Sequence, residues 1–184
     1  GGLLEKNGQV EVVSSLERDG RPVFKDLRWG VFAVLQAPND YAASCFKQYG
    51  MNTDNTGQFS AMYKPFHLIG MELNISIFSA ALLNQATGQT KTFTGDVVAT
   101  TKRNIKKGEI LDGEGGETVW GKLVPSKTSL STGALPIGLA HGIKLKNDVK
   151  ENEIMKWTDV DFSSNDPAIS YRKSMENDFK FLLD

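Results

Sequence analysis

Residues 101–111 read Thr-Lys-Arg-Asn-Ile-Lys-Lys-Gly-Glu-Ile-Leu, and residues 145–155 read Leu-Lys-Asn-Asp-Val-Lys-Glu-Asn-Glu-Ile-Met. The second phrase repeats the first 44 residues further along the chain, from position 101 to position 145. Gly108 is aligned with Asn152, and these two residue types adopt positive φ most readily. Each copy is therefore predicted to form a hairpin of strand, tight turn and strand. Because a lone hairpin is only marginally stable, we expect the two copies to face each other around one small core.

The composition limits the class of protein. A chain of 184 residues with 40% hydrophobic content can bury a core in one domain or in two small ones. Its 21 basic and 22 acidic residues leave no basic excess for binding a nucleic-acid backbone. The single cysteine, Cys45, excludes an internal disulfide and a cysteine metal cluster. No stretch resembles a membrane span or a secretory signal, so we expect a cytoplasmic protein.

The first half of the chain has loosely patterned strands and one strongly apolar helix. The predicted elements are strands at 9–16, 29–37 and 60–63, and helices at 41–49, capped by Asn39 and Asp40, and at 66–84. The run at 29–37 is continuously apolar and is expected to be buried on both faces. The helix at 66–84, with Pro65 in its first turn, is apolar nearly all round. It needs cover from a sheet or another chain, which predicts a homo-oligomer.

The second half is predicted to be mostly strands. They are expected at 97–101, 110–111, 119–123, 142–145 and 154–155. The segment 126–138 is rich in Ser, Thr, Gly and Pro and is expected to be irregular. Asp166-Pro167 opens a terminal helix that runs to about residue 182, with the aspartate as its cap. The whole chain is therefore predicted to be α+β.

One candidate anion site lies at residues 63–67, Tyr-Lys-Pro-Phe-His, where a strand is predicted to end and a helix to begin. A helix N-terminus attracts anions, and Lys64 adds a formal charge beside it. His67 can exchange a proton near neutral pH. The functional interpretation is a pocket for a substrate carboxylate or phosphate. The structural alternative is a solvated Lys64 and a His67 that hydrogen-bonds a backbone carbonyl.

The remaining motifs favour structural roles. The glycines at 113–116 lie between predicted strands and precede no helix, which indicates a β-turn and not a dinucleotide-binding loop. His67 and His141, without paired carboxylates, do not form a metal site, and His141 is interpreted as a structural hydrogen-bonding residue. Lys102, Arg103, Lys106 and Lys107 form a basic cluster. This cluster either faces solvent or contacts an acidic sugar or a neighbouring domain.

The repeated phrase resembles the signature of SAF domains, which are β-clip modules. Longer motifs at 63–73, 111–116, 120–123 and 133–142 resemble those of SAF-tailed oxidoreductases related to homoserine dehydrogenase. That group includes a branch resembling deoxyxylulose-phosphate reductoisomerase. The resemblance extends over most of residues 29–180.

The resemblance implies that residues 1–92 are the end of a mixed-sheet substrate and dimerisation domain. Residues 93–184 would be the SAF (β-clip) domain with a terminal helix. In such enzymes an upstream Rossmann domain binds NAD(P), so this chain alone is expected to bind no cofactor and to be inactive. Tyr63, Lys64 and His67 would contact a small phosphorylated or carboxylated substrate.

Within the SAF domain the candidate site residues are His141, Lys102 and Arg103, and no metal is expected. The start at Gly1 without a methionine fits either a piece of a longer protein or the remnant of a tag. One alternative is a freestanding β-clip module that binds a carbohydrate or a protein without catalysis. Another is a SAF-containing sugar-acid dehydratase, which the low number of histidines disfavours.

Overall fold

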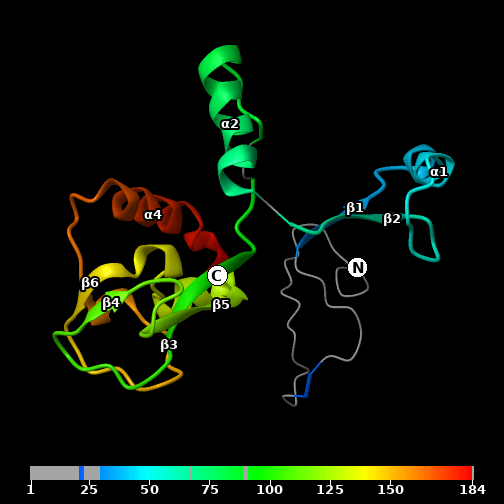
Figure 1. Cartoon of the computed structure of the whole chain (residues 1–184). Helices are drawn as coiled ribbons and strands as arrows, with labels where there is room; N and C mark the ends of the chain where they lie inside the picture. Colours follow the sequence, from blue (N-terminus) through cyan, green and yellow to red (C-terminus); the bar gives the residue numbers. More distant parts are fainter. Residues whose placement is uncertain (1–20, 23–29, 67, 89–90, 184) are drawn as a thin grey trace. The chain divides into compact units, whose positions relative to one another are not determined.

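The computed structural model describes residues 21–22, 30–66, 68–88 and 91–183 (Figure 1). The chain divides into two compact units, residues 1–91 (unit 1) and residues 92–184 (unit 2). Both contain helices and small antiparallel sheets, so the predicted α+β class is confirmed. The predicted strand at 9–16 lies outside the described residues.

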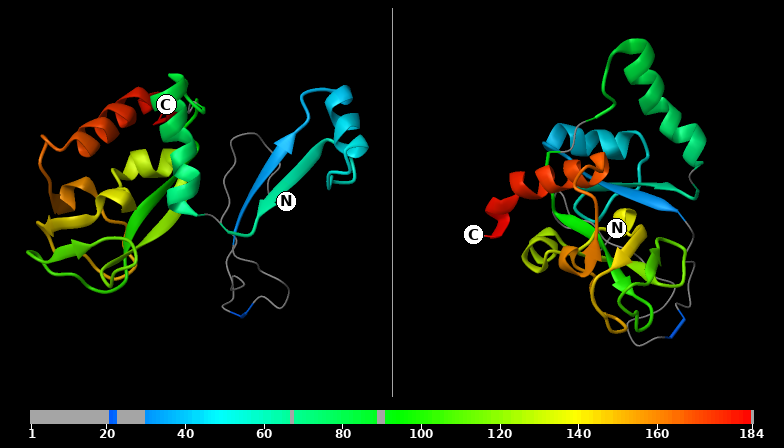
Figure 2. Two further views of the ribbon diagram at one scale, coloured as in Figure 1. Left: turned by 45° about the horizontal axis from the view of Figure 1, so that its top comes forward. Right: turned by 90° about the vertical axis from the view of Figure 1, so that its left-hand side faces the viewer.

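Unit 1 contains a two-stranded antiparallel ribbon. Strand β1 (Val31–Gln36) pairs with β2 (Phe59–Lys64). Helix α1 (Asp40–Gln48) connects the two strands and lies at one end of the ribbon (Figure 2). The Asn39 side chain caps α1 because its Oδ1 accepts a hydrogen bond of 2.9 Å from the Ala42 amide. These two strands and the capped helix confirm the predictions for this part of the chain.

Helix α2 (Ile69–Leu83) follows β2 and begins later than predicted. Leu68 occupies its N-cap position with extended backbone angles, so Pro65 is not in the first turn of the helix. The prediction that the helix begins at residue 66 is therefore wrong. At the other end, Asn84 adopts a left-handed conformation with φ of 52° and terminates the helix.

Many large apolar side chains of β1 and α2 are exposed, which corrects two burial predictions. In β1, exposed and half-buried residues alternate from Val31 to Val34, and the last two residues of the strand are exposed. Val31 is 58% exposed, so the strand is not buried on both faces. Helix α2 has no buried residue, and its large apolar side chains are 51–76% exposed. The reason is geometric, since the described part of unit 1 provides a single narrow ribbon and a helix apolar all round needs cover on several sides. Cover of α2 by another chain stays a prediction.

Unit 2 contains two antiparallel sheets and two longer helices, with α4 along one side of the unit (Figure 1). One sheet pairs β3 with β5, and the other has the order β4-β6-β7. The elements are β3 (Gly95–Thr101), β4 (Ile110–Asp112), β5 (Val119–Pro125), α3 (Ser126–Thr132), β6 (His141–Leu145), β7 (Val160–Asp161) and α4 (Pro167–Asp178). Short 3-10 helices occur at Ile137–Leu139, Trp157–Asp159 and Lys180–Leu183. No described helix is long and apolar enough to span a membrane.

Three elements of unit 2 differ from the predictions. The segment predicted to be irregular contains α3, whose Ser126 and Ser129 hydroxyls donate to the Phe93 carbonyl and the Asp96 carboxylate. These hydroxyl contacts anchor a helix that has no apolar periodicity. The predicted strand at 154–155 is reduced to one bridge between Ile154 and Thr100, and β7 was not predicted. The terminal helix is confirmed, with Asp166 as its cap.

The two copies of the repeated phrase form equivalent turns that contact each other reciprocally. The aligned residues Ile105 and Val149 exchange two backbone hydrogen bonds, both of 2.9 Å. At the tips of the turns Gly108 and Asn152 have φ of 90° and 64°, which confirms the predicted positive φ. This reciprocity gives unit 2 an approximate internal two-fold relation.

The strands beside these turns cross over between the copies. Ile110, after the first turn, pairs with Lys144 before the second copy. The equivalent pair on the other side joins Ile154 to Thr100. Each copy is thus not a hairpin on its own, and that part of the prediction is wrong. The strand that leaves each turn pairs with the strand that leads into the other turn, so each copy completes the other.

The core of unit 2 lies beneath the two turns. The aligned residues Ile105, Val149, Leu111 and Met155 are all at most 5% exposed. They pack with Val119, Leu135, Val160 and Ile169 of the surrounding elements in one cluster. The repeated phrases therefore supply the centre of the core, as expected from their sequence.

Candidate functional site

The predicted anion site lies at the end of β2, where Lys64 is the last residue of the strand. Its ammonium group forms an ion pair with the carboxylate of Glu72 in the first turn of α2. A negative charge is favourable at a helix N-terminus, so this position suits Glu72. The structure thus supplies Lys64 with an internal anion, which sequence analysis missed because no pattern links these two positions.

The other two candidate residues flank this pair in sequence. Tyr63 is 48% exposed and precedes Lys64 on the strand. His67 lies outside the described residues. Gly30 packs closely against this corner, because a Cβ atom added there would overlap the Lys64 carbonyl and lie 2.9 Å from the Tyr63 ring. Gly30 therefore packs closely against the backbone of the corner formed by Tyr63, Lys64 and Glu72. The side chains of Tyr63 and Lys64 are about half exposed to solvent.

The glycine-rich segment in unit 2 is a turn, as predicted, and the structure shows that it is built around Asp112. The Asp112 carboxylate accepts hydrogen bonds from the Glu117 amide (2.6 Å), the Thr118 amide (3.0 Å) and the Thr118 hydroxyl. The Thr118 hydroxyl is the main cause that lowers the pKa of Asp112 to about 2, and the two amides add to it. A Cβ atom added at Gly116 would overlap this carboxylate. Since the loop's amides already bind an internal anion, the loop does not fit the phosphates of a dinucleotide.

Two of the three candidate site residues in unit 2 contact this same loop. The Lys102 ammonium donates to the Gly116 carbonyl at 2.5 Å, and His141 Nδ1 lies 3.0 Å from the Asp112 carbonyl oxygen. Arg103 instead forms an ion pair of 2.9 Å with Glu109 in the first turn, which raises the pKa of Arg103. The structure therefore brings Lys102 and His141 together and leaves Arg103 in a different contact.

A largely buried ionic network in unit 2 was not found from the sequence. The Arg172 guanidinium of α4 donates twice to Asp96 of β3, at 3.2 and 2.5 Å, and its Nε donates to Glu176 at 2.9 Å. The Glu176 carboxylate also accepts from the Trp157 indole at 3.0 Å and from the Lys173 ammonium at 2.9 Å. Every one of these charged groups has a partner of opposite charge, so we interpret the network as structural. The only sequence pattern that could have indicated this network is the four-residue spacing of Arg172 and Glu176, which places both side chains on one face of a helix.

Burial acts to lower the pKa of both cations of this network, Lys173 and Arg172, but the net pKa shifts are opposite. Desolvation lowers the pKa of Lys173, whose ammonium lies 3.7 Å from the centre of the Trp157 ring. Burial also acts to lower the pKa of Arg172, but the hydrogen bonds to Asp96 and Glu176 outweigh it and raise the pKa. The ion pairs between Arg172 of α4 and Asp96 of β3 thus hold α4 against the β3–β5 sheet.

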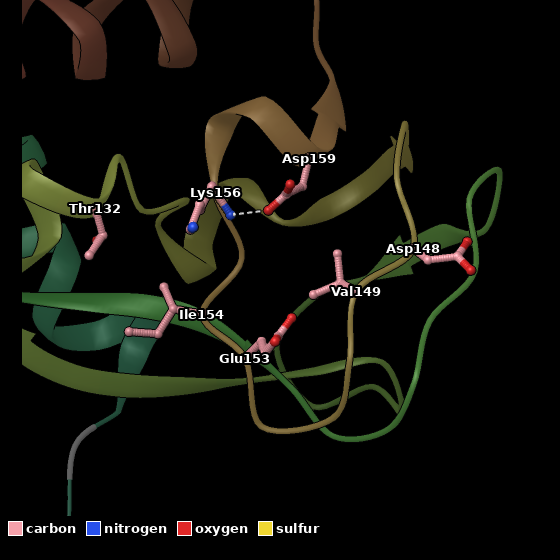
Figure 3. Close-up of a pocket in the computed structure, with 7 residues that line it drawn as sticks. All are labelled: Thr132, Asp148, Val149, Glu153, Ile154, Lys156 and Asp159. Atoms are coloured by element: carbon pink, nitrogen blue, oxygen red, sulfur yellow. Dashed lines mark hydrogen bonds between the residues drawn. The ribbon is translucent and has the colours of Figure 1, made fainter.

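A pocket of about 340 Å³ lies beside the second copy of the repeated phrase (Figure 3). It is lined by Thr132, Asp148, Val149, Glu153, Ile154, Lys156 and Asp159. Sequence analysis did not identify it, because its lining comes from α3, the second turn and the following 3-10 helix. Among the described residues there is no group of three or more His, Cys, Asp or Glu side chains that could hold a metal ion.

Comparison with known proteins bears on unit 1. Residues 1–73 match the family model described as oxidoreductase DRL, catalytic domain. The matched segment includes β1, α1, β2 and the first turn of α2, and therefore both Lys64 and Glu72. No curated protein matches the chain. The family match supports an oxidoreductase family for this protein.

Proposed function

We propose that this chain is part of an NAD(P)-dependent oxidoreductase related to homoserine dehydrogenase, in which unit 1 contributes the substrate site. The observation that supports this most is the match of residues 1–73 to an oxidoreductase catalytic domain, since that segment contains the Lys64 corner. The sequence has no Gly-x-Gly-x-x-Gly fingerprint, and the amides of Glu117 and Thr118, which follow the glycines at 113–116, donate to the Asp112 carboxylate. The dinucleotide is therefore assigned to a Rossmann domain of the parent protein. Unit 2 is proposed to be the SAF domain.

The proposed role of the corner is to hold the anionic group of a small carboxylated or phosphorylated substrate. The Lys64–Glu72 pair is exposed to solvent, with 54% of the Lys64 side chain accessible. Exposed ion pairs contribute little to stability, so a substrate anion can replace Glu72 as the partner of Lys64 at low cost. Tyr63 is proposed to donate its hydroxyl to the substrate, and His67 is proposed to orient the substrate or exchange a proton.

Substitutions in the full-length enzyme test this role. Lys64→Ala and His67→Ala are each expected to lower kcat/KM by at least about tenfold, which is about 1.4 kcal/mol of transition-state binding. Melting temperatures are expected to change little, because the lost ion pair is exposed. The measurement is NAD(P)H oxidation with a panel of carboxylated and phosphorylated carbonyl compounds.

The matched variants separate binding from folding. Glu72→Gln removes the internal competitor for Lys64 and is expected to lower KM. Lys47→Ala, a lysine at the end of α1, is the control and should leave kcat/KM unchanged. Wild-type activity in both the Lys64 and the His67 variants would contradict the proposal. A full-length protein without activity towards any pyridine nucleotide would favour a freestanding β-clip binding module.

The exposed α2 supports a homo-oligomer as part of this proposal. The helix carries one acidic residue, Glu72, which is paired with Lys64, so two copies can approach without charge repulsion. We expect the chain to be a dimer or larger at tens of micromolar in sedimentation experiments. Phe78→Glu places a charge at a side chain that is 56% exposed on α2, and it is expected to produce monomers.

The control for this experiment lies in unit 2. Ile110 is 61% exposed, so Ile110→Glu adds the same charge at a similarly accessible apolar position outside α2. This variant should keep the wild-type oligomeric state. A wild-type chain that sediments as a monomer would rule out the proposed interface.

A further inference from the structure

Each residue of the second copy that lines the pocket of unit 2 has an equivalent in the first copy, 44 residues earlier in the chain. The contacts of the equivalent residues can therefore be compared. In the first copy Glu109 is fully engaged. Its Oε1 accepts from the Lys106 amide at 2.6 Å and its Oε2 from Arg103 at 2.9 Å. Both carboxylate oxygens are thus held within the turn.

In the second copy the equivalent glutamate is only half engaged. Glu153 Oε2 accepts from the Lys150 amide at 3.2 Å, and among the described residues its Oε1 has no donor. The cause is a difference in sequence, since Asn147 stands where the first copy has Arg103. The Asn147 amide is too short to take the place of the guanidinium and donates to the Thr158 carbonyl at 3.3 Å. One oxygen of Glu153 is therefore available at the pocket.

A second difference supplies a positive charge. Lys156 stands where the first copy has Asp112, the carboxylate that binds its own loop. The Lys156 backbone amide donates to Asp159 at 3.0 Å, while its ammonium makes no ion pair with any described residue. Glu153 and Lys156 are therefore opposite charges that line one pocket without pairing with each other.

The other lining groups limit what this pocket binds. Val149 and Ile154 supply an apolar surface between the charged groups. The Asp148 carboxylate points away from the other labelled side chains in Figure 3, and it is engaged by the Lys106 ammonium and the Lys107 amide at 2.9 and 2.8 Å. Asp159 also lines the pocket, and its Oδ2 accepts from the Lys156 backbone amide at 3.0 Å. A ligand with a single charge would leave either the Glu153 carboxylate or the Lys156 ammonium without an opposite charge from the ligand.

From this geometry we infer that the pocket is a binding site for a small aliphatic zwitterion of the α-amino acid class. The ligand's ammonium group contacts Glu153, its carboxylate contacts Lys156, and its aliphatic chain packs on Val149 and Ile154. This site lies in unit 2 and does not depend on the oxidoreductase role proposed for unit 1.

The test is a titration of the methyl-labelled chain with L-norvaline, followed by NMR at the Val149 and Ile154 methyl groups. Saturable shifts in the millimolar range are expected. Pentanoate, which lacks the ammonium group, and butylamine, which lacks the carboxylate, should each bind at least about tenfold more weakly. Equal binding of either analogue would overturn the zwitterion site, as would the absence of saturable shifts with norvaline.

A matched pair of variants uses the repeat itself. Asn147→Arg introduces the residue found in the first copy, so its guanidinium should pair with Glu153 and weaken norvaline binding at least about tenfold. Glu109→Gln changes the equivalent carboxylate in the first copy and should leave binding unchanged. Norvaline affinity that is unaffected by Asn147→Arg, or lost in Glu109→Gln, would overturn the assignment.

Discussion

Replacing Arg172 with alanine is expected to lower the free energy of unfolding by about 3–5 kcal/mol, because it leaves Asp96 buried without its counter-ion. Asp96 is 8% exposed, and the Arg172 side chain is 13% exposed. The guanidinium also donates to Glu176, so both carboxylates lose a charged donor. Denaturant unfolding followed by circular dichroism measures the change.

The control is Arg103→Ala, which removes an arginine of an exposed ion pair with Glu109. Its expected cost is below about 1 kcal/mol. The double variant Asp96→Ala/Arg172→Ala should lose less than the sum of the two single variants, because it leaves no unpaired carboxylate at position 96. A loss below about 1 kcal/mol in Arg172→Ala would show that the network does not hold α4.

The effect of Arg172→Ala should also depend on pH through Glu176. Burial acts to raise the pKa of Glu176, but hydrogen bonds from Arg172, Lys173 and Trp157 outweigh it and leave the pKa below its ordinary value. A depressed pKa contributes stability above the unfolded value of about 4.3, and this contribution is lost as the pH falls towards the folded value. The deficit of Arg172→Ala is therefore expected to be smaller at about pH 3 than at about pH 7.

Replacing Ile105 with alanine is expected to cost about 2–5 kcal/mol of stability. Ile105 is fully buried, and its backbone exchanges two hydrogen bonds with Val149 at the contact between the two turns. The shortened side chain leaves a cavity at the centre of the core that both copies of the repeat build. Thermal and denaturant unfolding of the whole chain measure this loss.

The repeated phrase contains its own control, since Ile110 is the same residue type and is 61% exposed. Ile110→Ala is expected to cost less than about 1 kcal/mol, because the side chain is mostly in water already. Similar costs for the two variants would contradict the interlocked core. A large cost for Val149→Ala, 5% exposed in the second copy, would support it.

The sequence predicted elements best where local chemistry determines them. Asn39 and Asp166 cap helices where expected, and Gly108 and Asn152 adopt positive φ at equivalent turns. The crossed pairing of the copies could not be predicted, because Ile110 pairs with Lys144 through a contact that no local pattern encodes. Helix α3 was missed for a related reason, since its serines bond to groups more than 30 residues away in the chain.

The candidate sites also contain features that local sequence predicts and features that depend on contacts distant in the chain. The position of Lys64 at the end of a strand was predictable, but its partner Glu72 was not, because the pairing depends on where α2 begins. The pocket of unit 2 combines residues from three elements and carries no motif. Its charges become interpretable only when Glu153 and Lys156 are compared with Glu109 and Asp112 in the first copy.

The crossed turns also set the order in which this part of the chain acquires structure during synthesis. The first turn is completed by a hydrogen bond from Gly108 to Leu145, and the second by one from Asn152 back to Thr101. Ribosomes add about 5–20 residues per second, so the first copy waits a few seconds for its partner to emerge. Contacts so distant in sequence slow folding. Nascent chains arrested before the second copy leaves the ribosome should therefore remain sensitive to protease at the first turn.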